Sequence, residues 1–308
     1  MAENILINFP TNIGDTILGL PVLDKLRANY PKSVITVIAS PYTKDFLSRN
    51  NFVNEVIVFD KAWSSLKKMK FSFSLKGNFD MVVDLKNSFL PVILGCRVRT
   101  PFVRKFPLDM HAKDTYLAII EKLAPASATT KSDFTLTEEE KSKWAHFKLS
   151  PSVFIACSSR SSLKSYPYRY LKEVSDSLRK DCRLVILGEE SDRKYYKDIL
   201  FQEGVVDLVG KTKLYDIFYL LKNYAQLLLC VDSSILQLGS YLNLPLVALF
   251  GPTDPRRYGP WSDTFIVLRD ERSLCLPCKK PTCNFTAECM QIMPAEVLGA
   301  IEKMLKKL

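Results

Sequence analysis

Residues 227–254 read LLLCVDSSILQLGSYLNLPLVALFGPTD. The apolar run Leu227–Val231 precedes the polar Asp232-Ser233-Ser234; a helical pattern then extends to about Tyr241, and a second apolar run covers Pro245–Phe250. This order predicts a buried strand, a turn, a helix and a second buried strand, which together form a βαβ unit. Ligands of open parallel sheets bind at the carboxyl ends of strands. Asp232 and the loop Gly251–Asp254 are therefore predicted to line a substrate pocket.

Short apolar runs alternate with helical patterns throughout the chain. In the N-terminal half, strands are predicted at Asn4–Phe9, Val34–Ala39, Glu55–Phe59 and Met81–Leu85, with helices at Thr16–Asn29 and Pro41–Arg49. In the C-terminal half, strands are predicted at Val153–Cys157, Arg183–Leu187, Val205–Leu208 and Phe265–Leu268, with helices at Tyr168–Arg179, Ser191–Phe201 and Leu214–Asn223. Such alternation predicts the α/β class with doubly wound parallel sheets.

A change in composition separates the two halves. Residues 124–152 are rich in Pro, Ala, Ser and Thr and include the charged run Glu138–Lys143, which is typical of a linker with a surface helix. We therefore expect two Rossmann-like domains that face a cleft, comprising residues 1–150 and 151–292. Residues 293–308 are expected to form a C-terminal helix that packs back on the N-terminal domain.

The composition indicates a globular protein with anionic partners. Of the 308 residues, 47% are hydrophobic and 25% charged, and the formal net charge is +10. This charge favours nucleic acid, phosphorylated ligands or an anionic membrane surface without choosing among them.

The segment Trp63–Phe73 mixes lysines with large apolar residues, a pattern typical of an interfacial surface. The apolar run Phe89–Cys96 is too short to span a membrane, so a cytoplasmic location is expected.

Two residues at predicted strand ends are candidates for chemistry. Asp15 lies where the first helix begins, and it can either stabilise the positive end of that helix or act as a general base. Lys164 ends a polar loop that begins at Ser158, and hydroxyls, backbone N–H groups and an ammonium at a helix entrance suit a phosphate. The alternative for Lys164 is an exposed loop lysine.

The segment Gly210-Lys211-Thr212 resembles the end of a P-loop. The glycine that the motif requires five residues before Gly210 is absent, because Val205 holds that place. A P-loop ATPase is therefore not predicted, although Thr212 stays a candidate contact for a phosphate.

Four of the eight cysteines fall within fifteen residues: Cys275, Cys278, Cys283 and Cys289. A Cys-x2-Cys opening is typical of metal knuckles, and a cytoplasmic setting disfavours disulfides. These residues predict a structural zinc site, with free thiols and redox-active pairs as alternatives. Four ligands would leave no open position, so a catalytic zinc is not expected.

Several segments together resemble glycosyltransferase family 9, the heptosyltransferases of lipopolysaccharide core assembly. The resemblance is carried by Gly14-Asp15, Phe79–Leu85, Lys164 with Tyr166-Pro167, Leu208–Leu214, Asp232-Ser233 and, most specifically, Ala248–Pro255. The cysteine pattern followed by Met293-Pro294 also looks like members of that family.

The resemblance implies a GT-B fold and an inverting transfer, with no metal or other cofactor, of a heptose from an ADP-sugar to a lipid-linked inner-core acceptor at the cytoplasmic membrane face. Asp15 would be the base, and Lys164, Ser233 and Ser234 match donor positions; Asp232 and Thr212 complete the donor set. The ribose contact would be Glu190 or Asp192. From their charge and placement, Arg97 and Arg99 are expected to meet acceptor carboxylates or phosphates.

Two residues depart from the family pattern, which usually has Gly where this chain has Ser234 and His where it has Gln237. Serine adds a Cβ and a hydroxyl, and glutamine keeps hydrogen bonding but does not titrate. Gln237 is retained as a donor-binding candidate.

The alternative to an active transferase is a non-catalytic or altered-donor relative that binds a sugar nucleotide. A third hypothesis, a zinc-bearing nucleic-acid binder, has no basic helix or aromatic platform to support it, and nucleic acid is not expected as a partner.

Overall fold

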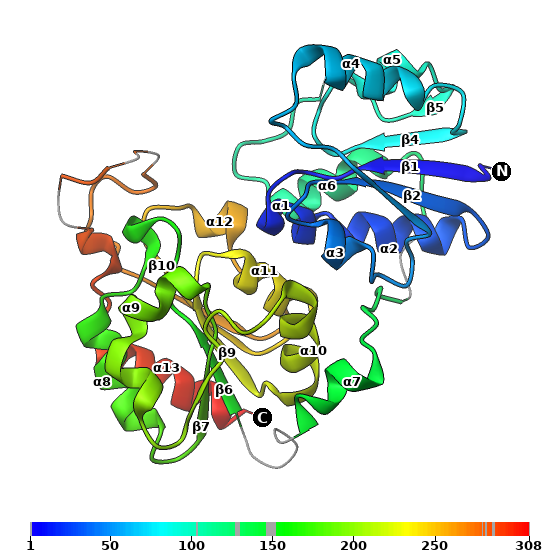
Figure 1. Cartoon of the computed structure of the whole chain (residues 1–308). Coiled ribbons are helices and arrows are strands. Elements are labelled where there is room, and N and C mark those ends of the chain that lie inside the picture. The colour runs from blue at the N-terminus through cyan, green and yellow to red at the C-terminus, as the bar shows by residue number, and fades with distance from the viewer. Residues whose placement is uncertain are drawn as a thin grey trace. The chain divides into compact units, whose positions relative to one another are not determined.

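The chain forms two compact units, Met1–Thr135 and Leu136–Leu308. The computed structural model describes residues 2–102, 104–126, 130–145, 152–278, 280, 282–284 and 287–307 (Figure 1). The predicted domain boundary at residues 150 and 151 lies outside these described residues. We describe each unit by itself.

The first unit is built on a parallel sheet of five strands. These are β1 (Asn4–Asn8), β2 (Val34–Ala39), β3 (Glu55–Val58), β4 (Met81–Asp84) and β5 (Val98–Arg99), in the order β3-β2-β1-β4-β5. Strand β1 is buried from Ile5 onward because helices cover both faces of the sheet. The order reverses direction between β1 and β4, which creates a switch point at their carboxyl ends.

Helices cover both faces of this sheet (Figure 1). One layer contains α1 (Ile13–Leu18), α2 (Leu20–Asn29), α3 (Lys44–Leu47) and α6 (Ala112–Ile120), and the other contains α4 (Ser65–Ser74) and α5 (Leu90–Leu94). Under the second layer, Leu6 and Val82 of the sheet pack with Leu90 of α5, and Phe71 of α4 joins them. No helix among the described residues is long and apolar enough to cross a membrane.

The helix predicted at Thr16–Asn29 is two helices that meet at Gly19. Pro21, near the start of α2, lacks a backbone N–H and suits the first turn of a helix rather than its interior. A Cβ on Gly19 would lie 3.0 Å from Leu85 Cδ1 and 3.1 Å from Phe9 Cε1, so the close approach of two strand-end side chains favours glycine there.

The second unit contains a parallel sheet of six strands. They are β6 (Ser152–Ala156), β7 (Arg183–Ile186), β8 (Val205–Asp207), β9 (Leu227–Val231), β10 (Leu246–Phe250) and β11 (Phe265–Arg269), in the order β11-β10-β9-β6-β7-β8. The predicted βαβ unit is confirmed as β9, α11 (Ser234–Tyr241) and β10. This strand order is that of dinucleotide-binding Rossmann sheets, with the switch point between β6 and β9.

The remaining helices complete the second unit. They are α7 (Glu138–Ser142), α8 (Tyr168–Leu178), α9 (Arg193–Tyr196), α10 (Leu214–Tyr224), α12 (Pro255–Tyr258) and α13 (Pro294–Leu305), with 3-10 turns at Ser162–Lys164, Glu190–Asp192, Lys197–Phe201 and Glu288–Met290. The predicted surface helix is α7, which a capping box of Thr137 and Glu140 begins. The helix predicted at Ser191–Phe201 is instead broken into short pieces, with Lys197 at φ +38°.

The C-terminal helix α13 packs within the second unit. Val297, Ile301 and Met304 are buried in the same core as Leu229 of β9 and Leu171 of α8. The sequence had suggested packing against the first domain, but the apolar face that such a contact needs is occupied in its own unit. A contact of the exposed side of α13 with the first domain stays a prediction.

Two helical glycines provide a matched test of how tightly α11 packs. A Cβ on Gly239 would lie 2.6 Å from Leu228 Cδ2, and Leu228 is fully buried, whereas a Cβ on Gly299 of α13 meets nothing within 4 Å. We expect Gly239→Ala to lower the free energy of unfolding by about 1–3 kcal/mol because the core is overpacked. We expect Gly299→Ala to raise it by about 0.5–1 kcal/mol through helix propensity. Urea unfolding of both variants checks this, and equal shifts would contradict the packing.

Candidate functional site

Three side chains meet at the switch point of the second sheet. Lys164 Nζ donates to Asp232 Oδ2 at 2.6 Å, and Thr253 Oγ1 donates to the same oxygen at 2.8 Å. They follow β6, β9 and β10, which are neighbours in the sheet, so the parallel topology brings three distant segments together. The side chains of Lys164 and Asp232 are 30% and 12% exposed. The ammonium is thus held in place yet remains open to a ligand.

Two hydroxyls among the described residues of this unit have no hydrogen-bond partner, one in the residue after Asp232 and one in the loop after β8. Ser233 Oγ and Thr212 Oγ1 are both buried and unpaired in the described structure. Ser233 occupies the N-cap position of α11 but its side chain makes no capping bond, and Ser234 is the first residue of the helix. A buried hydroxyl without a partner costs free energy, so both positions suit groups that a bound ligand satisfies.

Glu190 is brought close to the loop that carries Thr212. Gly210, at φ +72°, packs so tightly under Glu190 that a Cβ there would collide with the carboxylate, and Gly210 N donates to Gly188 O at 2.9 Å. Arg193 Nε donates to Glu190 Oε1 at 2.9 Å, and the Glu190 side chain is 70% exposed. The loops after β7 and β8 therefore present a carboxylate and a hydroxyl at one edge.

Gln237, by contrast, has an internal role. It is 3% exposed; its Nε2 donates to Tyr258 O at 2.7 Å, and its Oε1 accepts from Trp261 Nε1 at 3.0 Å. Both ends of the amide are thus engaged in holding the segment after α12. Its predicted role in donor binding has no open hydrogen-bonding atom to support it.

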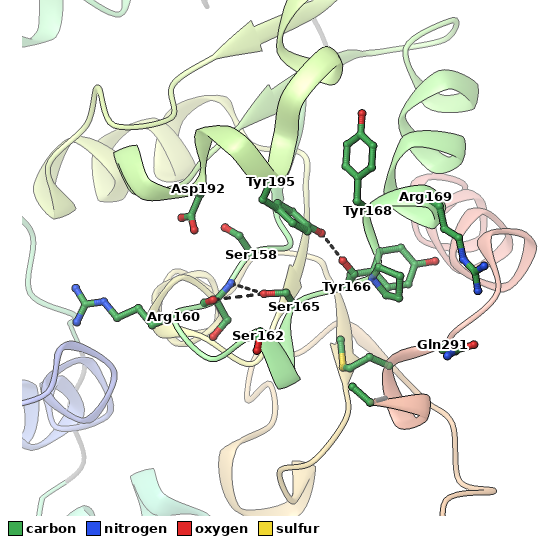
Figure 2. Close-up of a pocket in the computed structure, with 14 residues that line it drawn as sticks. Ser158, Arg160, Ser162, Ser165, Tyr166, Tyr168, Arg169, Asp192, Tyr195 and Gln291 are labelled. Atoms are coloured by element: carbon green, nitrogen blue, oxygen red, sulfur yellow. Dashed lines mark hydrogen bonds between the residues drawn. The ribbon is translucent and has the colours of Figure 1, made fainter. Parts of the chain in front are cut away.

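A pocket of about 570 Å³ lies beside the loop that leads to Lys164 (Figure 2). Tyr195 donates to Tyr166 O at 2.5 Å and thereby fixes the aromatic wall, while Ser165 Oγ bonds Ser159. Arg160, at the rim, forms a two-pronged ion pair with Glu189. The pocket and the strand-end cluster share only this serine-rich loop. Sequence reasoning singled out its hydroxyls and Tyr166 but missed Tyr168 of α8 and Tyr195 of α9 as part of one pocket.

In the first unit, Asp15 lies in the first turn of α1 rather than at its N-cap. The N-cap is Asn12, whose side chain makes no capping bond but donates from Nδ2 to Asp15 Oδ2 at 3.1 Å. Asp15 is partly exposed. This arrangement fits both a carboxylate near a helix N-terminus and a base oriented by an amide.

A polar network closes the switch point of the first sheet. Asn8 Nδ2 donates to Asp84 Oδ1 at 2.7 Å, which joins the ends of β1 and β4. Arg104 donates to Asp84 O at 2.7 Å, and its side chain is only 5% exposed. Lys86 Nζ lies 4.8 Å from the ring of Phe59, and burial lowers the pKa of Lys86 to about 8 although Asp84 opposes that shift.

Arg97 and Arg99 lie elsewhere on this sheet. Val98 pairs with Met81 at the start of β4, so Arg97 lies at the amino ends of the strands, away from Asp84. Arg99 turns in the same direction, because its guanidinium donates to Cys96 O at 3.1 Å. Their predicted contact with acceptor carboxylates or phosphates stays a prediction, and a strand of two residues gives no periodic pattern from which their direction could be read.

The four clustered cysteines differ in their exposure to solvent. Cys275 is exposed, Cys278 and Cys283 are partly exposed, and Cys289 is buried. Burial raises the pKa of the Cys289 thiol, and the nearby Cys275 and Cys283 raise it further. Among the residues that the structure describes, no three His, Cys, Asp or Glu side chains gather to hold a metal ion. The predicted structural zinc is not supported.

Comparison with known proteins assigns the chain to a family. A family model described as glycosyltransferase family 9 (heptosyltransferase) matches residues 69–288. The chain belongs to glycosyltransferase family 9. It is 24% identical to lipooligosaccharide heptosyltransferase 2 of Haemophilus influenzae, over 86% of this chain and 88% of that protein. It is 23% identical to lipopolysaccharide heptosyltransferase 3 of Escherichia coli, over 95% of each.

Solved structures of family 9 proteins share the fold. A family 9 glycosyl transferase from Veillonella parvula superposes with a TM-score of 0.81 at 23% identity, covering 99% of this chain and 98% of that one. The ADP-heptose lipopolysaccharide heptosyltransferase II of Escherichia coli gives 0.77 at 22% identity over 99% of each chain. The two Rossmann-like units are thus those of a GT-B glycosyltransferase, as the sequence predicted.

In this family 9 enzyme, Gln237 of α11 has a structural role, whereas Ser233 at the N-cap of α11 is a candidate for ligand contact. We expect Gln237→Ala to lower the free energy of unfolding by about 1–3 kcal/mol, because it removes the hydrogen bonds that Gln237 makes with Tyr258 O and Trp261 Nε1. Ser233→Ala removes no hydrogen bond and should leave stability unchanged or slightly higher. Thermal and urea unfolding of the two variants tests this contrast. A stable Gln237→Ala protein would show that the amide is not structural.

Proposed function

We propose that this enzyme transfers a heptose, with inversion at the anomeric carbon, from an ADP-sugar to an inner-core lipopolysaccharide acceptor. The observation that carries the proposal is the Lys164–Asp232 ion pair at the switch point of the second sheet, next to which the hydroxyl of Ser233 is buried without a hydrogen-bond partner. The names of the relatives supply the sugar and the nucleotide: several are lipopolysaccharide heptosyltransferases, and one solved structure is of an ADP-heptose enzyme.

The second unit has the groups that a nucleotide diphosphate requires. The Lys164 ammonium and the backbone N–H groups at the start of α11, at Ser233 and Ser234, would bind the diphosphate. Negative charge grows on the leaving phosphate as the glycosidic C–O bond breaks, and these groups would stabilise it in place of a metal. Glu190 and Thr212 are the candidates for the nucleoside end, since their loops adjoin.

Asp15 is proposed as the general base. Its carboxylate would take the proton of the acceptor hydroxyl as that oxygen attacks the anomeric carbon, while ADP leaves from the opposite side of the carbon. The hydrogen bond from Asn12 Nδ2, at 3.1 Å, orients the carboxylate without neutralising it, because an amide is uncharged. The partial exposure of Asp15 leaves it accessible to an acceptor.

Lys86 is our candidate for binding an anionic group of the acceptor. It lies at the same carboxyl edge of the first sheet as Asp84, and its amine contacts the Phe59 ring. A desolvated ammonium gains from an anionic partner because the partner restores its favoured charged state. Arg97 and Arg99, which the sequence suggested for this role, lie toward the amino edge and are less well positioned.

The acceptor of such a reaction is lipid-linked, so we propose a cytoplasmic enzyme that contacts the anionic inner face of the membrane and binds no nucleic acid. The non-catalytic alternative is not favoured, because the chain belongs to an enzyme family over most of its length. The alternative rested partly on Gln237, which replaces the usual histidine of the family. Because the Gln237 amide is hydrogen-bonded within the protein, this replacement no longer argues against activity.

The first experiment measures ADP release from ADP-heptose in the presence of a truncated inner-core acceptor. We expect the wild-type enzyme to turn over and Asp15→Asn to lose at least about 100-fold in kcat, because the amide cannot accept the proton. ADP binding, measured by calorimetry, should be unchanged in this variant. Asp45→Asn, at an exposed position in α3, is the matched control. Full turnover by Asp15→Asn would refute the assignment of the base.

The second experiment tests Lys86 through pH. The charged lysine is the binding form, so the KM for the acceptor should rise as pH increases through about 8 in the wild type and stay flat in Lys86→Arg. The folded pKa is depressed, so wild-type stability should rise from pH 8 toward the unfolded pKa of the lysine. Lys86→Met should therefore be more stable at pH 7 by about 1–3 kcal/mol.

Lys32→Met, an exposed change ahead of β2, is the control for the Lys86 experiment. It should alter neither the KM for the acceptor nor stability. An acceptor KM in Lys86→Met equal to that of the wild type at pH 7 would remove Lys86 from the acceptor site and leave the proposed reaction itself intact.

A further inference from the structure

Helix α4 turns an apolar stripe outward. Leu66, Met69 and Phe73 are 67%, 50% and 55% exposed, and their spacing of three and four residues puts them on one side of the helix. No residue of α4 is fully buried. Phe201 of the second unit, by contrast, is exposed between the buried Leu200 and the polar Gln202. The stripe is therefore an organised surface.

The inner side of α4 fixes the direction of this stripe. Phe71 packs against Phe59 and Trp63, with each pair of ring centroids 5.5 Å apart, and Ser64 caps the helix by accepting from Lys67 N at 3.4 Å. The outward direction of Met69 is thus set by packing on the opposite side of the helix.

Lysines frame the stripe. Residues 61–79 contain five lysines, at positions 61, 67, 68, 70 and 76, and no acidic residue. Lys67 Nζ lies 4.2 Å from the centroid of the Trp63 ring, which anchors one of these charges. Lys70 lies one turn from Leu66 on the side of the stripe. An apolar stripe flanked only by positive charges is the pattern of a helix that lies in a membrane interface.

A second short helix extends the surface. Helix α5 lies beside α4 (Figure 1), and Phe89 and Val92 at its start are 62% and 50% exposed. The two helices form the same layer over the first sheet. Their exposed apolar side chains therefore enlarge the area available for contact with one partner.

We propose that this surface, Leu66, Met69 and Phe73 of α4 with Phe89 and Val92 of α5, binds an anionic lipid bilayer. The apolar side chains would enter the acyl boundary while the exposed Lys67 and Lys70 meet lipid phosphates. The charge selects this occupant, because a run of lysines without a counter-charge complements anionic lipid headgroups and repels a second copy of this cationic chain. The inference rests on the proposed function only for its purpose, which is access to a lipid-linked acceptor.

The test is co-sedimentation of the full-length protein with vesicles. Wild-type protein should bind vesicles of phosphatidylcholine with 30% phosphatidylglycerol at low salt and lose most of this binding without phosphatidylglycerol. The variant Leu66→Ser/Met69→Ser/Phe73→Ser should bind at least 10-fold less. The milder Met69→Ser, which disturbs no buried contact, should show a smaller loss. Phe201→Ser, at 87% exposure in the second unit, is the matched control and should bind like the wild type.

ADP release with a water-soluble truncated acceptor separates this inference from the proposed reaction. The triple variant should keep wild-type turnover in that assay, which also shows that it is folded. Equal vesicle binding by wild type and both stripe variants would overturn the proposal. So would a wild-type dimer in solution that the triple variant dissociates without any binding to lipid, because the stripe would then serve self-association.

Discussion

The salt bridge between Lys164 and Asp232 crosses the point at which the second sheet reverses its strand order. Parallel strands need crossover helices, and where successive crossovers run to opposite sides no helix covers the carboxyl ends of the two central strands. Backbone groups and polar side chains at those ends therefore lack the covering that the rest of the sheet has. Lys164, Asp232 and Thr253 satisfy one another there, and a ligand has only to compete for Lys164. The unpaired hydroxyl of Ser233, which follows Asp232 directly, indicates that this part of the site is formed before the ligand arrives.

The first sheet also has a switch point at the carboxyl ends of its central strands, but different side chains fill it. Its switch point is closed by Asn8 and Asp84, and the buried Arg104 neutralises the carboxylate. At the same edge the Lys86 amine lies over the Phe59 ring, and burial lowers its pKa although the charge of Asp84 opposes that shift. The two edges thus differ in chemistry. The edge of the second sheet holds the paired Lys164 beside hydroxyls, which suits a diphosphate. The edge of the first sheet holds the desolvated amine of Lys86 and the carboxylate of Asp15, which suits an anionic acceptor that carries a hydroxyl.

The sequence was sufficient for the parts of the fold that depend on long apolar runs. Strands such as Leu227–Val231 are buried on both faces, and their uninterrupted apolar composition follows from that burial. Asp232, which directly follows such a strand, could be named for the same reason, and Lys164 could be named from the polar loop that it ends. The direction of side chains in short elements could not. Arg97 and Arg99 flank a strand of two residues, and Gln237 has a hydrophilic side chain that the fold engages internally. The cysteine spacing suggested a shared metal, but burial divides those thiols between the core and the surface.

The aromatic cluster of Phe59, Trp63 and Phe71 links the outer surface of the first unit to its polar edge. Phe59 follows β3 and contacts Lys86 with its ring, while Trp63 and Phe71 hold the inner side of α4. The same three rings therefore orient a helix whose outer face is apolar and support an amine at the carboxyl edge of the sheet. A change in the packing of α4 would be felt at Lys86, because close-packed aromatic side chains transmit displacement rather than absorb it. The position of the Lys86 amine and the orientation of α4 are consequently two results of one packing arrangement.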